Sequence, residues 1–75
     1  METIYLKEDY IKLGQALKAA GAVGSGVEAK IEIQDGKVKV NGETEVRRGK
    51  KLVAGDMVEY NGTIIKIENE KTGKR

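Results

Sequence analysis

The spacing of apolar residues changes near Lys37, and this change most limits the folds open to the chain. Apolar residues recur with the helical i, i+3, i+4, i+7 spacing between residues 13 and 20. After Lys37, Val38 and Val40 alternate with charged residues, as in a strand with one buried face. Since 75 residues suffice for only one small core, the pattern predicts a single α+β domain.

The first helix is expected over residues 9–20. Asp9 is a suitable N-cap residue because its carboxylate can accept a hydrogen bond from a free backbone amide. Gly21 can adopt the left-handed conformation that commonly follows the last helical residue. Lys12 would then lie one turn after Glu8. It could extend a basic surface, but pairing with Glu8 is the interpretation we favour.

A second helix is expected from Ser25 to about residue 34, where Asp35-Gly36 ends it. Ser25 and Glu28 have the spacing of a capping box. Two apolar pairs have i, i+4 spacing within the helix. We expect Val27 and Ile31 to face the first helix, with Ala29 and Ile33 as the second pair.

The remaining residues predict a small antiparallel sheet of three or four strands, on which the two helices pack. Asn-Gly pairs at 41–42 and 61–62 favour type I′ turns, because both central residues need positive φ. They join strands expected at 37–40 and 43–46, and at 57–60 and 63–67. Residues 1–67 would form the domain, and residues 68–75, which include no apolar side chain, a flexible polar tail.

Composition excludes most compact catalytic sites. The sequence contains no histidine and no cysteine, so thiol nucleophiles, imidazole bases, disulfides and cysteine zinc sites are absent. Its local carboxylate pairs are better explained as solvated surface, and no phosphate-binding loop motif occurs. We therefore expect no enzyme activity, cofactor, metal or small-molecule substrate.

The apolar runs and the first residues of the chain predict its location. No run approaches the roughly 18 apolar residues of a membrane-spanning helix. The N-terminal residues lack the basic and apolar regions of a secretory signal. We expect a cytoplasmic protein without a membrane segment.

Positive charge is concentrated in the middle of the chain, although the net charge is only +2. Residues 37–51 contain six basic residues against two acidic ones. The lysines of the 37–40 strand would face away from its valines, and four cations surround Gly49, where the loop can bend. Such groups can bind phosphates, although they can also serve only to keep an exposed surface soluble.

Several short segments, at their relative spacing, resemble the S4 RNA-binding domain over about residues 10–67. The most specific are Gly36-Lys-Val-Lys-Val-Asn-Gly42 and the Gly55-Asp56 turn. The others are Leu13-Gly-Gln-Ala-Leu-Lys18, residues 21–25, Glu28-Ala-Lys30, Arg47-Arg48 and Lys50-Lys-Leu52. The amino-acid sequence of residues 25–30 and 47–51 is similar to that of the small stand-alone bacterial S4-like proteins of the YaaA and YbcJ type.

The resemblance implies an αL-type fold and a basic face that binds structured RNA, ribosomal or transfer RNA above all. Many S4 domains have an arginine directly after the serine that begins the second helix, where this chain has Gly26. One phosphate or base contact of the family is therefore missing. We expect a monomer that binds RNA shape and backbone, because three tyrosines are the only aromatic residues. Two of them, Tyr10 and Tyr60, are assigned to core or rim positions, so few surfaces remain for stacking bases.

The candidate RNA-binding residues are the basic side chains of the strand, the loop and the helices, together with one helix cap: Lys37, Lys39, Arg47, Arg48, Lys50, Lys51, Lys30, Lys18 and Ser25. Lys18 could instead only complement the negative end of its helix. Ser25 could act only as a cap.

Two other interpretations remain open at this point. The chain could be a protein–protein adaptor whose sheet edge pairs with a partner strand. It could also be an accessory module for an RNA-acting enzyme, since S4 domains are often fused to such enzymes.

Overall fold

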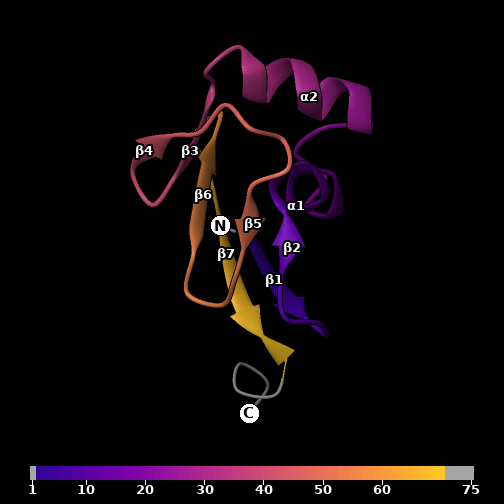
Figure 1. Ribbon diagram of the computed structural model, residues 1–75, viewed down its shortest axis with the longest axis vertical. Coiled ribbons are helices and arrows are strands. Elements are labelled where there is room, and N and C mark those ends of the chain that lie inside the picture. The colour runs from indigo at the N-terminus through magenta and orange to yellow at the C-terminus, as the bar shows by residue number, and fades with distance from the viewer. Residues whose placement is uncertain (1, 71–75) are drawn as a thin grey trace.

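A computed structural model describes residues 2–70 and confirms the α+β class (Figure 1). Two helices lie against one side of a sheet, and a second, two-stranded sheet lies beside α1. The elements in chain order are β1 (Glu2–Leu6), β2 (Ile11–Lys12), α1 (Leu13–Ala19), α2 (Gly26–Gln34), β3 (Val38–Val40), β4 (Glu43–Thr44), β5 (Lys51–Leu52), β6 (Met57–Tyr60) and β7 (Thr63–Asn69).

The main sheet is mixed and has five strands, in the order β1-β7-β6-β3-β4, so the expected antiparallel sheet of three or four strands was wrong in detail. The added strand is β1, which pairs with β7 in parallel, from Glu2 opposite Ile65 to Leu6 opposite Asn69. Sequence reasoning missed this strand because its partner lies at the other end of the chain. The predicted antiparallel pairs β3–β4 and β6–β7 are present.

Pairing with β1 also extends β7 beyond its predicted end at Ile67. Glu68 lies opposite Tyr5, and Asn69 lies opposite Leu6. The strand therefore includes two residues that the sequence placed in the tail. Residues 71–75 lie outside the described residues, and their predicted flexibility stays a prediction.

Helix α1 begins at Leu13, four residues later than expected, and Lys12 replaces Asp9 as its N-cap residue. Ile11 and Lys12 are extended because they pair with Leu52 and Lys51 of β5. The Gln15 side-chain oxygen accepts a hydrogen bond from the Lys12 amide at 3.2 Å. Glu8 therefore precedes the helix, and Lys12 forms no ion pair with it or with any other described residue.

Both helices end as their glycines predict. Gly21 and Gly36 have φ of 74° and 79°, in the left-handed region. After α1, the Gly21 and Ala22 amides donate to the Lys18 and Leu17 carbonyls at 3.0 and 2.9 Å. The residues after α2 repeat this arrangement, which is the Schellman motif.

Helix α2 presents the other of its two apolar pairs to the core. Ala29 and Ile33 are fully buried, whereas Val27 and Ile31 are 68% and 58% exposed, so the expected orientation was wrong. Residues two positions apart on a helix are rotated by about 200°, so only one pair can face inward. The buried pair joins a core formed by α1 and the inner sides of β3, β6 and β7. Neither helix in residues 2–70 is long and apolar enough to cross a membrane.

Asn41 and Asp56 connect the two turns that carry the most specific sequence motifs. The Asn41 side chain donates to an Asp56 carboxylate oxygen at 3.0 Å and accepts from the Met57 amide at 2.9 Å. The other Asp56 oxygen accepts from the Val53 amide at 2.9 Å. Asn41 also has φ of 53°, as the type I′ turn requires. These side chains therefore hold the β3–β4 turn against the loop before β6.

We predict that Asn41→Ala lowers the free energy of unfolding by about 2 kcal/mol, because the variant loses side-chain hydrogen bonds and a residue suited to positive φ. Asn61→Ala is the matched control. Asn61 has φ of 52° at the same position of its own turn, and its side chain makes no hydrogen bond within residues 2–70. The control should lose only the backbone contribution, about 1 kcal/mol. Equal losses in urea denaturation would contradict a stabilising role for the Asn41–Asp56 link.

A second polar contact joins α2 to the sheet. The Tyr60 hydroxyl donates to the Glu32 carboxylate at 2.6 Å. This hydrogen bond and the adjacent Lys37 ammonium hold the pKa of Glu32 below its ordinary value, despite partial burial. The same hydrogen bond, together with burial, raises the pKa of Tyr60 to about 12. The contact is therefore strongest when Glu32 is ionised and Tyr60 is protonated.

The contribution of this contact to stability should depend on pH at both extremes. Glu32 has a lowered pKa in the folded state, so its contribution is present above its ordinary value of 4.5 and is lost as the pH falls through the folded value. Tyr60 has a raised pKa, so its contribution is present below 10 and is lost as the pH rises toward 12. Tyr60→Phe should therefore be less stable than the parent near pH 7, with the difference shrinking at both ends. A pH-independent difference in denaturant unfolding would refute this account.

Candidate nucleic-acid interface

The basic loop over residues 45–51 is bonded to the start of α1 through its backbone. The Leu13 amide donates to the Lys50 carbonyl at 2.8 Å, and the Gly14 amide donates to the Arg48 carbonyl at 3.1 Å. These are amides at the N-terminus of a helix, which have no partner within the helix itself. The loop therefore takes the place of the predicted Asp9 cap and is fixed in position by doing so.

Gly14 allows the Arg48 side chain to lie directly on α1. A Cβ atom added at Gly14 would lie 2.7 Å from Arg48 Cγ and 3.3 Å from Cδ. Any other residue at position 14 would push the arginine away. The sequence did not reveal this contact, because Gly14 and Arg48 are distant in the chain.

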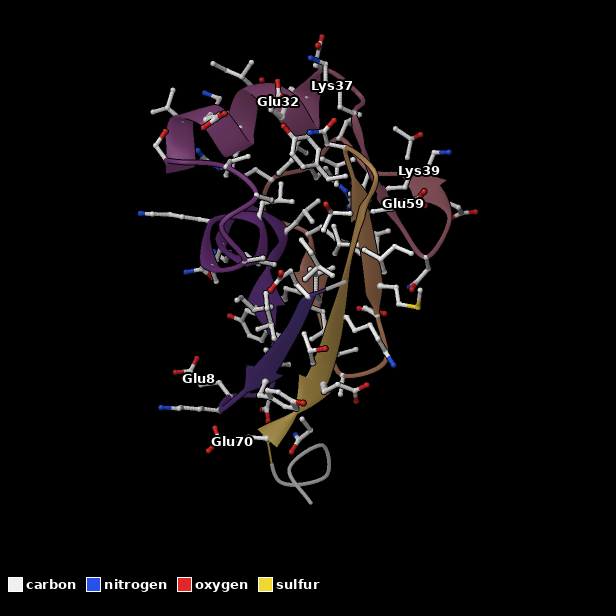
Figure 2. The ribbon with its side chains drawn as sticks, turned by 180° about the vertical axis from the view of Figure 1, so that it is seen from behind. Glu8, Glu32, Lys37, Lys39, Glu59 and Glu70 are labelled. Atoms are coloured by element: carbon white, nitrogen blue, oxygen red, sulfur yellow. The ribbon has the colours of Figure 1, made fainter. Side chains whose placement is uncertain are left out.

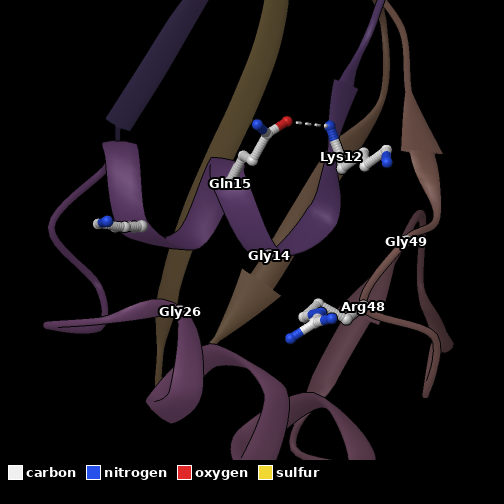
Figure 3. A pocket seen from close by; sticks show the side chains of 7 residues that line it. Lys12, Gly14, Gln15, Gly26, Arg48 and Gly49 are labelled. Atoms are coloured by element: carbon white, nitrogen blue, oxygen red, sulfur yellow. Dashed lines mark hydrogen bonds between the residues drawn. The ribbon is translucent and has the colours of Figure 1, made fainter.

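The loop and α1 enclose a pocket of about 370 Å³ that is lined by cations and glycines (Figure 3). The lining residues are Lys12, Gly14, Gln15, Lys18, Gly26, Arg48 and Gly49. None is acidic, and the three cations form no ion pair with any residue from 2 to 70. A pocket with unpaired positive charge and small glycine walls suits an anion such as a phosphate.

Lys12 and Gln15 were not among the sequence candidates. Lys12 had been assigned to an ion pair with Glu8 that depended on the wrong start for the helix. For Gln15 the usable signal was its spacing from Lys18, because residues three apart lie on the same side of a helix. The predicted candidates Lys18 and Arg48 do line the pocket with Lys12.

The N-terminus of α2 borders the same pocket through Gly26. Ser25 caps the helix as expected, its hydroxyl accepting from the Glu28 amide at 3.1 Å. The Glu28 carboxylate accepts from the Gly24 amide at 2.7 Å, one residue before the amide that a capping box would use. A Cβ added at Gly26 meets nothing within 4 Å, so this side of the pocket is open. Lys30 is exposed one helical turn after Gly26 and extends the positive surface along α2.

Neither Lys37 nor Lys39 lines this pocket, and Figure 2 shows Lys37 beyond the end of α2 and Lys39 beside Glu59 on the sheet. Lys37 follows the C-terminal end of α2, about 14 Å along the helix from Gly26. Its ammonium is 3.5 Å from both Glu32 and Asp35 carboxylates, and attraction to Glu32 is the main cause of its raised pKa. Lys39 is exposed on the sheet face opposite the core, with Glu59 beside it on β6.

The remaining loop cations are engaged in local contacts. Arg47 holds Glu45 with two side-chain hydrogen bonds, of 2.9 and 3.3 Å. This pair raises the pKa of Arg47 and lowers that of Glu45. The Lys51 ammonium lies 4.8 Å from the centroid of the Tyr10 ring, a cation–π contact. Lys50 is partly buried, and its carbonyl accepts the hydrogen bond from the Leu13 amide at the start of α1.

The pocket therefore brings together a subset of the predicted residues. Lys18 and Arg48 line it, Ser25 and Lys30 flank it on α2, and Lys50 and Lys51 lie in the loop and strand that follow Gly49. Lys37, Lys39 and Arg47 have other surroundings. No three carboxylates within residues 2–70 are grouped so that they could hold a metal ion.

Comparisons with known proteins agree with this architecture. Residues 4–68 match the family model described as the S4 domain. YbcJ of Escherichia coli K12, provisionally named as an RNA-binding protein, is 39% identical over 61 residues, which cover 81% of this chain and 87% of YbcJ. RlbA of Bacillus subtilis 168, provisionally named as a ribosome maturation protein, is 44% identical over 59 residues, which cover 79% of this chain and 83% of RlbA.

A solved structure shows the same fold. The solution structure of E. coli YbcJ, described as revealing an αL motif involved in RNA binding, matches with a TM-score of 0.70. The match covers 91% of this chain and 87% of YbcJ at 39% identity. Together with the family match over residues 4–68, this similarity shows that the chain belongs to the S4 domain family.

Proposed function

We propose that this protein binds the phosphate backbone of structured RNA, through the pocket between α1, the start of α2 and the basic loop. The observation that carries the proposal is the presence of three unpaired cations, from Lys12, Lys18 and Arg48, in a pocket without a carboxylate. Because all three come from elements fixed by backbone hydrogen bonds, little backbone ordering is needed when a phosphate binds.

The family relatives support RNA rather than another polyanion. YbcJ is named for RNA binding, and RlbA is named for ribosome maturation. Ribosomal RNA is therefore the proposed target, ahead of transfer RNA. The proposed role is non-catalytic binding by a monomer in the cytoplasm, where these RNAs are found.

The pocket residues would make two kinds of contact with phosphates. Arg48 has a planar guanidinium that can bind one phosphate with two hydrogen bonds. Lys12, just before α1, and Lys18, in the last turn of α1, would act as point charges. Contacts to phosphates set affinity and orientation without reading base sequence, so binding should follow RNA shape.

The proposal predicts saturable binding to a structured ribosomal RNA fragment that weakens as salt rises, measured by fluorescence anisotropy at several salt concentrations. An equal-length DNA duplex should bind more weakly. The variant Lys18→Gln/Arg48→Gln should reduce the slope of log affinity against log salt by roughly 2, since each phosphate contact contributes about one.

The charge-matched control is Lys39→Gln/Lys66→Gln. Both lysines lie on the sheet face opposite the core, away from the pocket. Its salt slope should equal that of the parent. Equal loss in both variants would show that binding uses general positive charge instead of the pocket. Failure of the parent to bind either polymer at low salt would reject RNA binding, and salt-insensitive capture of a protein would favour the adaptor interpretation.

Restoring the arginine that many S4 domains carry after the helix-capping serine should strengthen binding. The open space around Gly26 accommodates a side chain, and this position borders the pocket. Gly26→Arg should therefore add about one to the salt slope and raise RNA affinity several-fold at low salt. Gly26→Gln has a side chain that carries no charge and serves as the control. If arginine and glutamine variants bind alike in the same titration, the α2 N-terminus lies outside the interface.

A further inference from the structure

A second pocket, of about 330 Å³, lies next to the basic pocket and has a different character. Gln15 lines both pockets, so they are neighbours on either side of this residue. The walls of the second pocket are mainly apolar and aromatic, and include Ile4, Tyr10, Ile11 and Ala19. Lys7 and Glu8 add one charge of each sign.

Tyr10 lines this pocket, and its ring also contacts the Lys51 ammonium. Tyr10 is 39% exposed, whereas Tyr60 is packed against the core. Lys12 lies in β2, two residues after Tyr10 in the chain. Lys51 lies opposite Lys12 in the β2–β5 pair, and its ammonium is 4.8 Å from the Tyr10 ring centroid.

Gln15 has unused hydrogen-bonding capacity at the boundary of the two pockets. Its side-chain oxygen accepts from the Lys12 amide at 3.2 Å (Figure 3). Its amide nitrogen donates to no other group in residues 2–70. Two donors are therefore free to meet acceptor atoms of a ligand in either pocket.

We propose that the second pocket receives the base of one unpaired nucleotide of the bound RNA, which stacks on the face of the Tyr10 ring opposite Lys51. This inference rests on the proposed function, because the backbone of the same RNA would occupy the basic pocket. The phosphate beside the unpaired base would meet Lys12 and Lys51. The substrate class is then a structured RNA with an unpaired nucleotide next to a paired region.

A nucleotide fits these surroundings better than an apolar protein segment does. An aromatic face suits any base, and stacking requires no sequence-specific contact. A base is always linked to a phosphate. Here Tyr10 contacts Lys51, which pairs with Lys12 across β2 and β5, and the second pocket shares Gln15 with a pocket that suits phosphate. An apolar protein segment would use the apolar walls but would leave the Lys12 ammonium without a partner.

The test compares two RNA hairpins with the same stem, of which one carries a single bulged 2-aminopurine and the other is fully paired. The parent should bind the bulged hairpin about fivefold to tenfold more tightly. The fluorescence of the bulged 2-aminopurine should change when the parent protein binds. Tyr10→Leu should bind both hairpins alike and lose the fluorescence change, whereas Tyr10→Phe should retain the preference, because stacking needs the ring but not the hydroxyl.

Ala19→Leu provides a second variant that leaves Tyr10 intact. Ala19 is exposed and lines the pocket, so the larger side chain should fill it without disturbing the core. Ala19→Leu should lose the preference for the bulged hairpin, as Tyr10→Leu does. It therefore tests the proposal even if Tyr10→Leu folds poorly. Affinity for the paired hairpin should stay within about twofold of the parent, because the phosphate contacts are unchanged.

The outcomes separate this inference from the proposed function. Equal, salt-dependent binding of both hairpins by the parent would overturn the base-binding pocket and leave RNA binding intact. Retention of the preference in Ala19→Leu and Tyr10→Leu would also overturn it. Absence of binding to either hairpin at low salt would reject the proposed function itself. Binding of an extended peptide beside β1 that Ala19→Leu blocks, with no preference between the hairpins, would assign the pocket to a protein partner instead.

Discussion

The attachment of the basic loop to the start of α1 is the constraint on which the candidate functional surface depends. Two backbone hydrogen bonds, from Leu13 and Gly14 to loop carbonyls, hold together segments that are 34 or more residues apart. They satisfy amides that would otherwise need a capping side chain or water. The close approach at Gly14 then directs Arg48 across the helix and into the pocket. Helix capping and site formation are therefore the same interaction.

The sequence motifs most typical of the family have a structural role in this chain. Asn41 and Asp56 hydrogen-bond to each other and to neighbouring backbone amides. They are not among the residues that line the basic pocket. Such residues identify the fold because the turn and the loop before β6 require them.

Local signals predicted much of the fold, and non-local pairing accounts for most of the rest. Gly21, Gly36 and the two Asn-Gly turns were identified correctly because the positive φ that each adopts favours glycine or asparagine, which can be read from the local sequence alone. Strand β1 was missed because its pairing energy comes from β7, at the far end of the chain. The buried face of α2 was assigned wrongly because both apolar pairs fit a helical stripe, and only the position of the sheet decides between them.

The site was harder to predict because charge in a sequence does not show which cations are already paired. The count of cations between residues 37 and 51 gave equal weight to Lys37, Arg47 and Arg48. In the folded protein, the first two are held by carboxylates only two to five residues away. Arg48 has no such partner in residues 2–70, and α1 brings Lys12 and Lys18 to it. A phosphate competes with no carboxylate at that point, so a chain of low net charge can still offer a concentrated positive site.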